Sequence, residues 1–418
     1  MMEFFKVVEA EKVLKIIAEF DPLGTEEICR DFACGRILSC QINSPENLPH
    51  FPRSTMDGYA VRSQDTYGAS EGLPLMLNVT GRVSMGTPCT IEVKPGEAIA
   101  ITTGGMLPKG ADAVIMEEYC HLLDEETIEI TRSVTPWENV LRPGEDVKKG
   151  CAIFPRGHLV RFQDVGLMAA LGIESIEVFR KPRIAIISTG DEIVPSGTRK
   201  IPQGKVRDVN GPSIYSRLIS LGYPIERFGI VPDDERRLLE LCKEALFKDP
   251  PSDVLLLSGG SSIGMRDFTV KVISKLPDSN LVFHGIAIKP GKPTIFATSG
   301  KKAIWGLPGH PVSSMIVMLF FVEPFLHILE GLKQEEKFRR TIRAELRVNL
   351  PSVHGRLDFI RVKLHRDEKG GLFAEPVYGK SAMISTMTEA DGLVIIPTHS
   401  EGFEQGTEVD VLPFHLNP

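Results

Sequence analysis

Residues 253–268, DVLLLSGGSSIGMRDF, decide the fold class. The apolar run at 254–257 predicts a strand buried on both faces, which is typical of a parallel sheet. A loop of small residues follows at 258–264, and we expect a helix that begins at Asp267. In open α/β sheets, ligands bind where loops leave the carboxyl ends of strands, and glycine-rich loops let backbone N–H groups approach an anion. The carboxylate of Asp267 would repel phosphate unless a cation lay between them, so the loop suggests an anion with a divalent metal, and a plain turn is the alternative.

The surrounding residues, 179–331, alternate strand and helix patterns. A strand is expected at 183–188, a helix after Asn210, a second helix from about 235 to 247, further strands near 282–288 and 303–306, and an apolar helix at 312–329. Such alternation predicts a central three-layer α/β domain with a mostly parallel sheet and right-handed crossovers. Glu323 and Pro324 interrupt the apolar helix, which favours a buried helix over a membrane span.

The flanking residues have different patterns. An amphipathic helix is expected at 7–17 and a second helix from Thr25, while short alternating segments from 75 to 130 and from 343 to 414 are typical of β domains. We therefore expect four domains. They are a discontinuous N-terminal linking domain (1–44 and 142–178), a small β domain (45–141), the central domain (179–331) and a C-terminal β domain (332–418) that resembles a barrel.

Composition limits the class of partner. The 418 residues carry a net charge of −7, so long nucleic acids and acidic membranes are not expected partners. The N-terminus lacks the basic start and apolar core of a signal peptide, and we expect a cytoplasmic protein. Seven cysteines include no CxxC pair, which favours free thiols over a metal site or disulfides.

Four loops in the central domain are expected at the carboxyl ends of strands and therefore in one cleft. They carry Asp191 and Glu192, the 258–267 segment, Lys289 with Lys292, and the 308–313 segment. Carboxylates that hold Mg²⁺, together with lysines that bind phosphate oxygens, are typical of phosphate or phosphoanhydride chemistry. The alternative for each loop is a turn flanked by surface charges.

Outside these loops the residues leave several alternatives open. Asp57 could form a local Asx turn with Gly58 or act as a functional carboxylate, and the segment that follows Thr103 could bind an anion or only turn the chain. His284 and His310 could ligate a metal or an oxyanion, or could be structural. The sequence has no Ser-His-Asp order, Walker A loop or GxGxxG fingerprint.

Seven motifs occur in the order found in a known family. They are PRSTMDGYAV (52–61), TTGGMLPKGADAVIMEE (102–118), RPGED (142–146), STGDE (188–192), SGGSSIGMRDF (258–268), IKPGKPT (288–294) and GLPGHPVSS (306–314). The chain resembles the molybdopterin molybdenumtransferases, of the MoeA and gephyrin E-domain type, over essentially its whole length.

The resemblance implies an enzyme that takes adenylylated molybdopterin and molybdate, cleaves the phosphoanhydride with help from Mg²⁺, inserts molybdenum and releases AMP. It also implies an elongated homodimer, in which the active cleft lies between the central domain of one protomer and the small β domain of its partner. A molybdopterin adenylyltransferase and proteins that mature molybdoenzymes are candidate partners.

The resemblance also implies roles for individual residues. Asp57, Glu192, Asp267, Lys289 and Lys292 would be catalytic, and Glu192 and Asp267 would hold the cation. Substrate would be bound by Thr103, Asp146, Asp233, Ser258, Gly259, Gly260, Pro308, Pro311, Ser313, Arg361 and Ser381.

Two residues depart from the family pattern. Many members have Asn in place of His310 and a basic residue in place of Gly285. These departures bear on how the oxyanion is bound, so tungstate is an alternative substrate to molybdate. Two alternative functions are an adenylyl- or phosphotransferase that uses the same cleft and a non-catalytic binding or scaffold protein.

Overall fold

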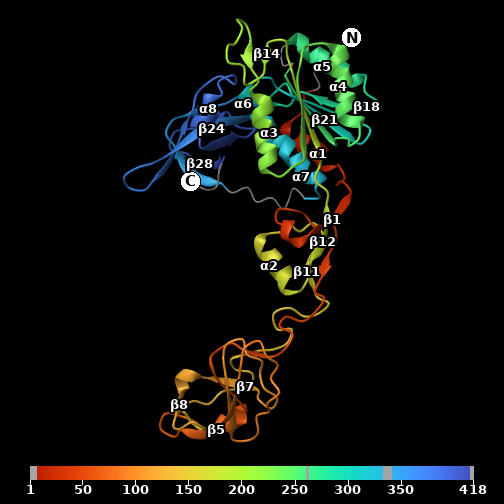
Figure 1. Cartoon of the computed structure of the whole chain (residues 1–418). Coiled ribbons are helices and arrows are strands. Elements are labelled where there is room, and N and C mark those ends of the chain that lie inside the picture. The colour runs from red at the N-terminus through yellow and green to blue at the C-terminus, as the bar shows by residue number, and fades with distance from the viewer. Residues whose placement is uncertain (1–6, 260–262, 333–340, 415–418) are drawn as a thin grey trace. The chain divides into compact units, whose positions relative to one another are not determined.

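A computed structural model describes residues 7–259, 263–332 and 341–414, with the backbone alone at 263–267. The chain forms two compact units. The first contains residues up to 26 and from 178 onward, and the second contains residues 27–177. Figure 1 shows the elements of both units in chain order.

A six-stranded sheet forms the centre of the first unit, in the order β16-β13-β17-β21-β20-β18. Strands β16, β13, β17 and β21 are mutually parallel, and β20 runs antiparallel to both of its neighbours. The mostly parallel sheet predicted from the 253–268 stretch is confirmed. The strands are β13 (Ile184–Thr189), β16 (Ile225–Val231), β17 (Val254–Gly259), β18 (Ser279–His284), β20 (Ile295–Ser299) and β21 (Lys302–Leu307).

Helices cover both faces of this sheet, because successive side chains of a strand point to opposite faces. Val254 and Leu256 pack in the core beneath α1, α3, α6 and α7, while Leu255 and Leu257 pack against α4 and α5. All four of these β17 side chains are at most 1% exposed. The helices are α1 (Ala10–Ala18), α3 (Asn210–Ser220), α4 (Glu235–Phe247), α5 (Ile263–Ser274), α6 (Pro311–Val317), the π-helical η4 (Met318–Val322) and α7 (Glu323–Leu329).

Among the described residues, one helix, Pro311–Leu329, is long and apolar enough to cross a membrane. In its most apolar window 83% of the residues are buried. It packs in the core of the first unit, as the sequence predicted for a buried helix.

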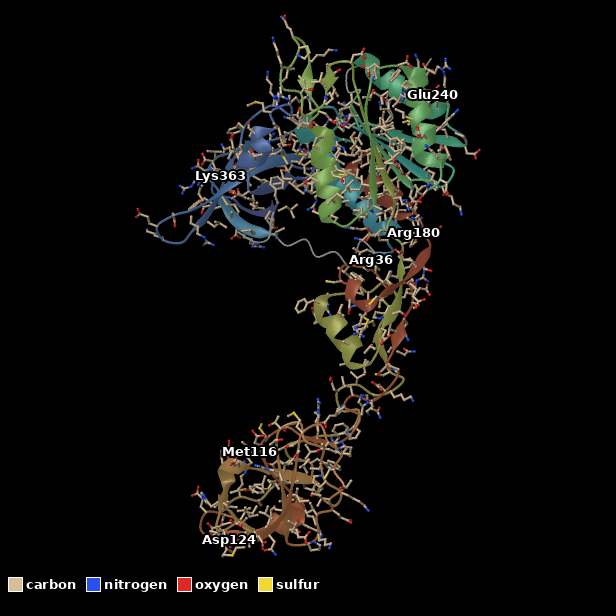
Figure 2. The ribbon with its side chains drawn as sticks, in the orientation of Figure 1. Arg36, Met116, Asp124, Arg180, Glu240 and Lys363 are labelled. Atoms are coloured by element: carbon tan, nitrogen blue, oxygen red, sulfur yellow. The ribbon has the colours of Figure 1, made fainter. Side chains whose placement is uncertain are left out.

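The start of β17 is fixed by an ion pair. Arg180, labelled in Figure 2, donates from both terminal nitrogens to the Asp253 carboxylate at 2.7 and 3.1 Å, and the Arg183 N–H donates to the same carboxylate at 2.9 Å. Burial alone would raise the pKa of Asp253, but these hydrogen bonds and the neighbouring positive charges lower it overall. The strand that leads to the candidate site therefore begins at a fixed point.

The C-terminal part of the first unit is a five-stranded barrel. Its strands run in the order β24-β25-β22-β28-β26, and pairing of β24 with β26 closes the ring. The short strand β19 (Ile288–Lys289), which comes from the central domain, pairs in parallel with β24. The remaining elements are β22 (Ile342–Leu346), β23 (Leu350–Pro351), β24 (Leu357–Arg366), β25 (Leu372–Pro376), α8 (Ser385–Glu389), β26 (Gly392–Ile396), β27 (Gly402–Phe403) and β28 (Glu408–Pro413).

The second unit contains a six-stranded sheet in the order β7-β4-β6-β5-β9-β8, with apolar clusters packed on it. Its strands are β4 (Gly58–Val61), β5 (Leu75–Val83), β6 (Glu97–Ile101), β7 (Ala113–Met116), β8 (Cys120–Leu122) and β9 (Thr127–Ile130). Helix α2 (Phe162–Ala170) and the 3₁₀ turns η1 (Arg30–Phe32), η2 (Ser63–Thr66) and η3 (Glu117–Tyr119) accompany them. Short two-stranded pairs are formed by β1 (Thr25–Cys29) with β12 (Ser175–Phe179), β2 (Ile42–Asn43) with β11 (Ala152–Phe154), and β3 (Arg53–Ser54) with β10 (Val140–Leu141).

Two element predictions are wrong. The helix expected from Thr25 is strand β1, because pairing with β12 across the chain overrides the local preference of a Thr-Glu-Glu start. Helix α5 begins at Ile263, four residues before the predicted Asp267. Gly264 therefore falls in the first turn, where the N–H groups of any helix have no intrahelical acceptor. The four predicted domain boundaries stay predictions.

Candidate functional site

A cavity of 1810 Å³ lies in the first unit, between the central sheet and the barrel. Ten residues proposed from the sequence line it. They are Glu192, Asp233, Gly259, Lys289, Lys292, Pro308, Pro311, Ser313, Arg361 and Ser381.

The strand directions explain why these loops meet. β18 is antiparallel to β20, which is antiparallel to β21, so β18 and β21 run in the same direction. The carboxyl ends of β13, β17, β18 and β21 therefore lie at one edge of the sheet. This edge carries Gly259 at the end of β17 and the segments that begin at Gly190, Gly285 and Pro308.

Carboxylates occupy one wall of the cavity. Glu192 follows β13, and its backbone C=O accepts from the Val206 N–H at 2.8 Å. Asp233 accepts from the Thr189 hydroxyl at 3.1 Å and from the Asp191 N–H at 3.2 Å, and the Asp233 N–H donates to the Asp191 carboxylate at 3.1 Å. These reciprocal bonds fix the loops after β13 and β16 to each other, and they leave Glu192 and Asp233 lining the cavity.

Lys289 and Lys292 belong to the connection from β18 to β20. Backbone bonds hold this connection: the Ile286 N–H donates to the Lys292 C=O at 3.0 Å, and the Thr294 hydroxyl donates to the Gly291 C=O at 2.7 Å. Both lysines line the cavity and are exposed. Ammonium groups at such positions can bind phosphate oxygens as point charges.

A second cationic group comes from the barrel. Arg361 of β24 donates to the Thr386 hydroxyl and to the Gly379 C=O, both at 2.9 Å, while its Nε is buried with no hydrogen-bond partner among the described residues. Burial lowers the pKa of Arg361, although its ordinary value is high enough that the guanidinium stays charged. Ser381 Oγ lies 2.8 Å from His310 Nδ1, and Ser313 is buried at the start of α6. This corner can bind a small anion.

The cavity is cationic although the chain is acidic. Of the described residues that line it, seven are lysines or arginines and three are aspartates or glutamates. Arg356 is partly neutralised by the buried Asp358 at 2.8 Å. The positive residues are Lys205, Arg207, Lys289, Lys292, Arg356, Arg361 and Lys380, and the negative ones are Glu192, Asp208 and Asp233.

Sequence reasoning missed Asp208 and Asn210. Asp208 accepts from the Ser188 hydroxyl and from the Gly211 N–H, both at 2.9 Å, and Asn210 Nδ2 donates to the Gly309 C=O at 2.9 Å. The Asp-x-x-Gly spacing before α3 is a capping pattern that could have indicated Asp208. The contact from Asn210 to Gly309 spans 99 residues, and no local pattern predicts it.

Of the predicted residues in the 258–267 segment, only Gly259 can be placed at the cavity. Ser258 is 1% exposed within β17 and does not line the cavity. Gly260 lies outside the described residues, and so does the side chain of Asp267, whose backbone belongs to α5.

Asp57 and Thr103 lie together in the second unit. The Thr103 N–H donates to Asp57 Oδ1 at 2.7 Å, so the carboxylate joins two loops rather than forming only a local Asx turn. The next residue, Gly58, has φ +153°, and a Cβ there would lie 2.0 Å from the Ile115 C=O oxygen, so only glycine fits. Asp146 is exposed, and its N–H donates to the Leu48 C=O at 3.1 Å.

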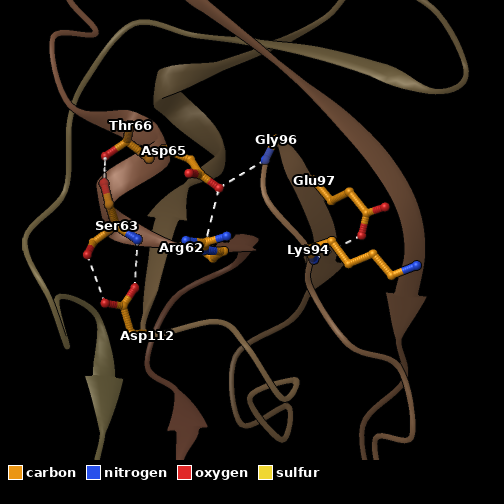
Figure 3. Close-up of polar contacts among 8 residues, drawn as sticks. All are labelled: Arg62, Ser63, Asp65, Thr66, Lys94, Gly96, Glu97 and Asp112. Carbon is orange, nitrogen blue, oxygen red and sulfur yellow. Dashed lines mark hydrogen bonds and ion pairs between the residues drawn. The ribbon is translucent and has the colours of Figure 1, made fainter.

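A polar network fixes the other end of β4, the strand that follows Asp57 (Figure 3). The Asp112 carboxylate accepts from the Ser63 N–H at 2.6 Å and from the Ser63 hydroxyl at 2.8 Å, and the Asp112 N–H donates to the Val61 C=O at 3.1 Å. Asp65 accepts from the Gly96 N–H at 3.0 Å. The network is structural, and it holds the strand that positions Asp57.

Comparisons with known proteins cover nearly the whole chain. Three family models match: "MoeA N-terminal region (domain I and II)" at residues 6–172, "Probable molybdopterin binding domain" at 185–328, and "MoeA C-terminal region (domain IV)" at 343–414.

Similar proteins include a putative molybdopterin biosynthesis protein of Methanocaldococcus jannaschii, 36% identical over 91% of this chain and 89% of that protein. A molybdopterin molybdenumtransferase of Haemophilus influenzae is 34% identical over 94% of this chain and 95% of that protein. A crystal structure of the molybdopterin biosynthesis MoeA protein from Pyrococcus horikoshii matches with a TM-score of 0.81 at 36% identity, over 98% of this chain and 100% of that one.

Proposed function

The chain belongs to the MoeA family of molybdopterin biosynthesis proteins, and from that premise we propose that it is a molybdopterin molybdenumtransferase. In the proposed reaction, the enzyme takes adenylylated molybdopterin and molybdate, cleaves the phosphoanhydride, inserts molybdenum into the dithiolene and releases AMP. One observation carries the proposal: carboxylates and a surplus of cations line a single cavity at the carboxyl edge of the sheet.

The cations offset the charge of two anions that would otherwise repel each other. We assign Lys289 and Lys292 to the phosphate groups. Arg361, Ser313 and Ser381 are assigned to the incoming oxyanion. Gly259, Pro308 and Pro311 would shape the cavity around the substrate through their backbone.

The donor set fits Mg²⁺. Glu192 and Asp233 supply carboxylate oxygens at the cavity wall, and Mg²⁺ is usually bound by one or two carboxylates with substrate phosphates and water. No group of three or more metal-binding side chains occurs among the described residues, which is compatible with that pattern. We assign the cation to Glu192 and to Asp267, whose side chain lies outside the described residues, and we assign Asp233 at the same wall to substrate binding. When bound, the cation would neutralise charge on the anhydride, and the protein residues would hold the carboxylates in place.

Further proposals concern the second unit and the assembly. We assign Asp57 to the catalytic set and Thr103 and Asp146 to substrate binding, and we propose a cytoplasmic homodimer. The largely exposed side chains of Phe32 (78%) and Phe162 (80%) support burial against another surface. Sedimentation of the full chain is expected to give twice the 46.1 kDa of one copy, and a monomer would contradict the dimer.

The deciding experiment measures AMP release from adenylylated molybdopterin with Mg²⁺, with and without molybdate, and with tungstate in parallel. Release that depends on molybdate supports the molybdenumtransferase. Release with tungstate alone would identify tungstate as the oxyanion substrate in place of molybdate. Turnover of ATP with metal-free molybdopterin would instead support an adenylyltransferase. No release under any condition from folded protein would favour a scaffold. In the active enzyme, Asp267→Ala is expected to abolish release and to leave folding intact.

A further inference from the structure

The contact between His310 and Ser381 joins the central domain to the barrel inside the cavity. His310 Nδ1 lies 2.8 Å from Ser381 Oγ, and both residues line the same cavity as Arg361. The two residues are 71 positions apart in the chain, so the contact is tertiary.

Both sides of the contact are held by the backbone. Asn210 Nδ2 donates to the Gly309 C=O at 2.9 Å, and the Ser314 N–H donates to the His310 C=O at 3.0 Å. Across the contact, the Val312 N–H donates to the Ser381 C=O at 3.1 Å. The backbones of His310 and Ser381 are therefore held in place independently of the bond between their side chains.

A serine hydroxyl has one proton to donate and two lone pairs to accept with. If Ser381 donated to His310, it would present only lone pairs to the cavity, and lone pairs repel an oxyanion. If His310 Nδ1–H donates to Ser381 Oγ, the hydroxyl proton stays available for an anion oxygen. The tautomer of His310 therefore decides whether Ser381 attracts or repels the ligand.

We propose that His310 is a positioning residue that donates its Nδ1–H to Ser381 and turns the Ser381 proton toward the bound oxyanion. The proposal rests on the proposed function, because it deepens the assignment of this corner to molybdate. His310 acts through Ser381 and needs no contact with the oxyanion.

The test measures tungstate binding to the full-length protein by titration calorimetry, without the pterin substrate. His310→Ala is expected to weaken binding about tenfold, because one hydrogen bond to a charged group is lost or misdirected. His310→Asn, whose amide can also donate, is expected to restore most of the affinity. His399→Ala replaces an exposed histidine outside the cavity lining and is expected to leave the affinity unchanged.

A double-mutant cycle separates orientation of the hydroxyl from support of the loop. In the Ser381→Ala background, His310→Ala is expected to cause no further loss, because no hydroxyl remains to orient. An equal loss in both backgrounds, or no loss from His310→Ala alone, would overturn the proposal, and so would wild-type protein that fails to bind tungstate. AMP release is measured separately. If the wild type releases AMP and His310→Ala binds tungstate as tightly as the wild type, the role of His310 is refuted while the proposed transferase function stands.

Discussion

Replacement of Gly259 by alanine tests whether the end of β17 has the geometry that the structure gives it. Gly259 has φ +124°, which L side chains rarely adopt, and it pairs with Thr189 in the parallel ladder between β13 and β17. A Cβ at this position would lie 1.9 Å from the Thr189 C=O oxygen and 3.2 Å from its methyl group. The added methyl therefore meets backbone, which cannot rotate away as a side chain can.

The expected cost combines two effects. An alanine at this φ costs about 1–3 kcal/mol in backbone strain. Moving the strands apart to relieve the clash weakens a ladder hydrogen bond by about 1 kcal/mol. Gly259→Ala is therefore expected to lower the free energy of unfolding of the first unit by about 2–4 kcal/mol. Because the same shift displaces the loop at the cavity wall, AMP release is expected to fall as well.

The two tryptophans allow a unit-specific assay. Trp305 is fully buried and pairs with Leu256 of β17, while Trp137 lies in the second unit. Urea unfolding followed by fluorescence in a Trp137→Phe background reports on the first unit. Gly197→Ala is the matched control, because a Cβ there has nothing within 4 Å. A Gly259→Ala change below about 0.5 kcal/mol, equal to the control, would refute the strand-end geometry.

Three other predictions concern single charged residues. Lys289→Ala is expected to lower kcat/KM for AMP release about a hundredfold. The control, Lys363→Ala on the exposed side of the barrel, is expected to leave kcat/KM unchanged. Equal effects of the two substitutions would contradict the assignment of Lys289. Asp57→Ala is expected to lower turnover at least about tenfold while Asp124→Ala, in an exposed turn of the same unit, does not. Burial opposes ionisation of Asp164, but bonds from Arg161 and His158 lower its pKa from 3.8 to about 2. Because the folded pKa is depressed, the stability that Asp164 contributes is present above about pH 4 and is lost as the pH falls toward 2. The difference in unfolding free energy between wild type and Asp164→Asn is therefore expected to disappear over that range. A difference that stays constant with pH would contradict the ion pair.

The sequence could predict the central sheet and the meeting of its loops, because both follow from local patterns. The fully apolar run in β17 requires cover on both faces, and parallel strands place their carboxyl ends at one edge. Lys289 and Lys292 were placed at that edge correctly even though β20 is antiparallel, because their connection leaves the carboxyl end of β18.

Local patterns could not predict which side chains touch across the chain. The Asp191–Asp233 bonds, the Asn210–Gly309 bond and the His310–Ser381 contact each depend on where two distant loops end. The strand at Thr25 was missed for the same reason, since β1 exists because β12 pairs with it.

The spacing of the cationic groups in the cavity is set by the barrel. Lys289 pairs with Asp358 of β24, the Leu357 N–H donates to the Ala287 C=O at 2.9 Å, and Arg361 lies three residues further along the same strand. At the rise of a β-strand, Asp358 and Arg361 are about 10 Å apart along β24. The lysine assigned to phosphate and the arginine assigned to the oxyanion are thus placed by one strand. Because Lys289 pairs with Asp358, a shift in the register between β19 and β24 would change the distance between Lys289 and Arg361, so the barrel is part of the site and more than a support for it.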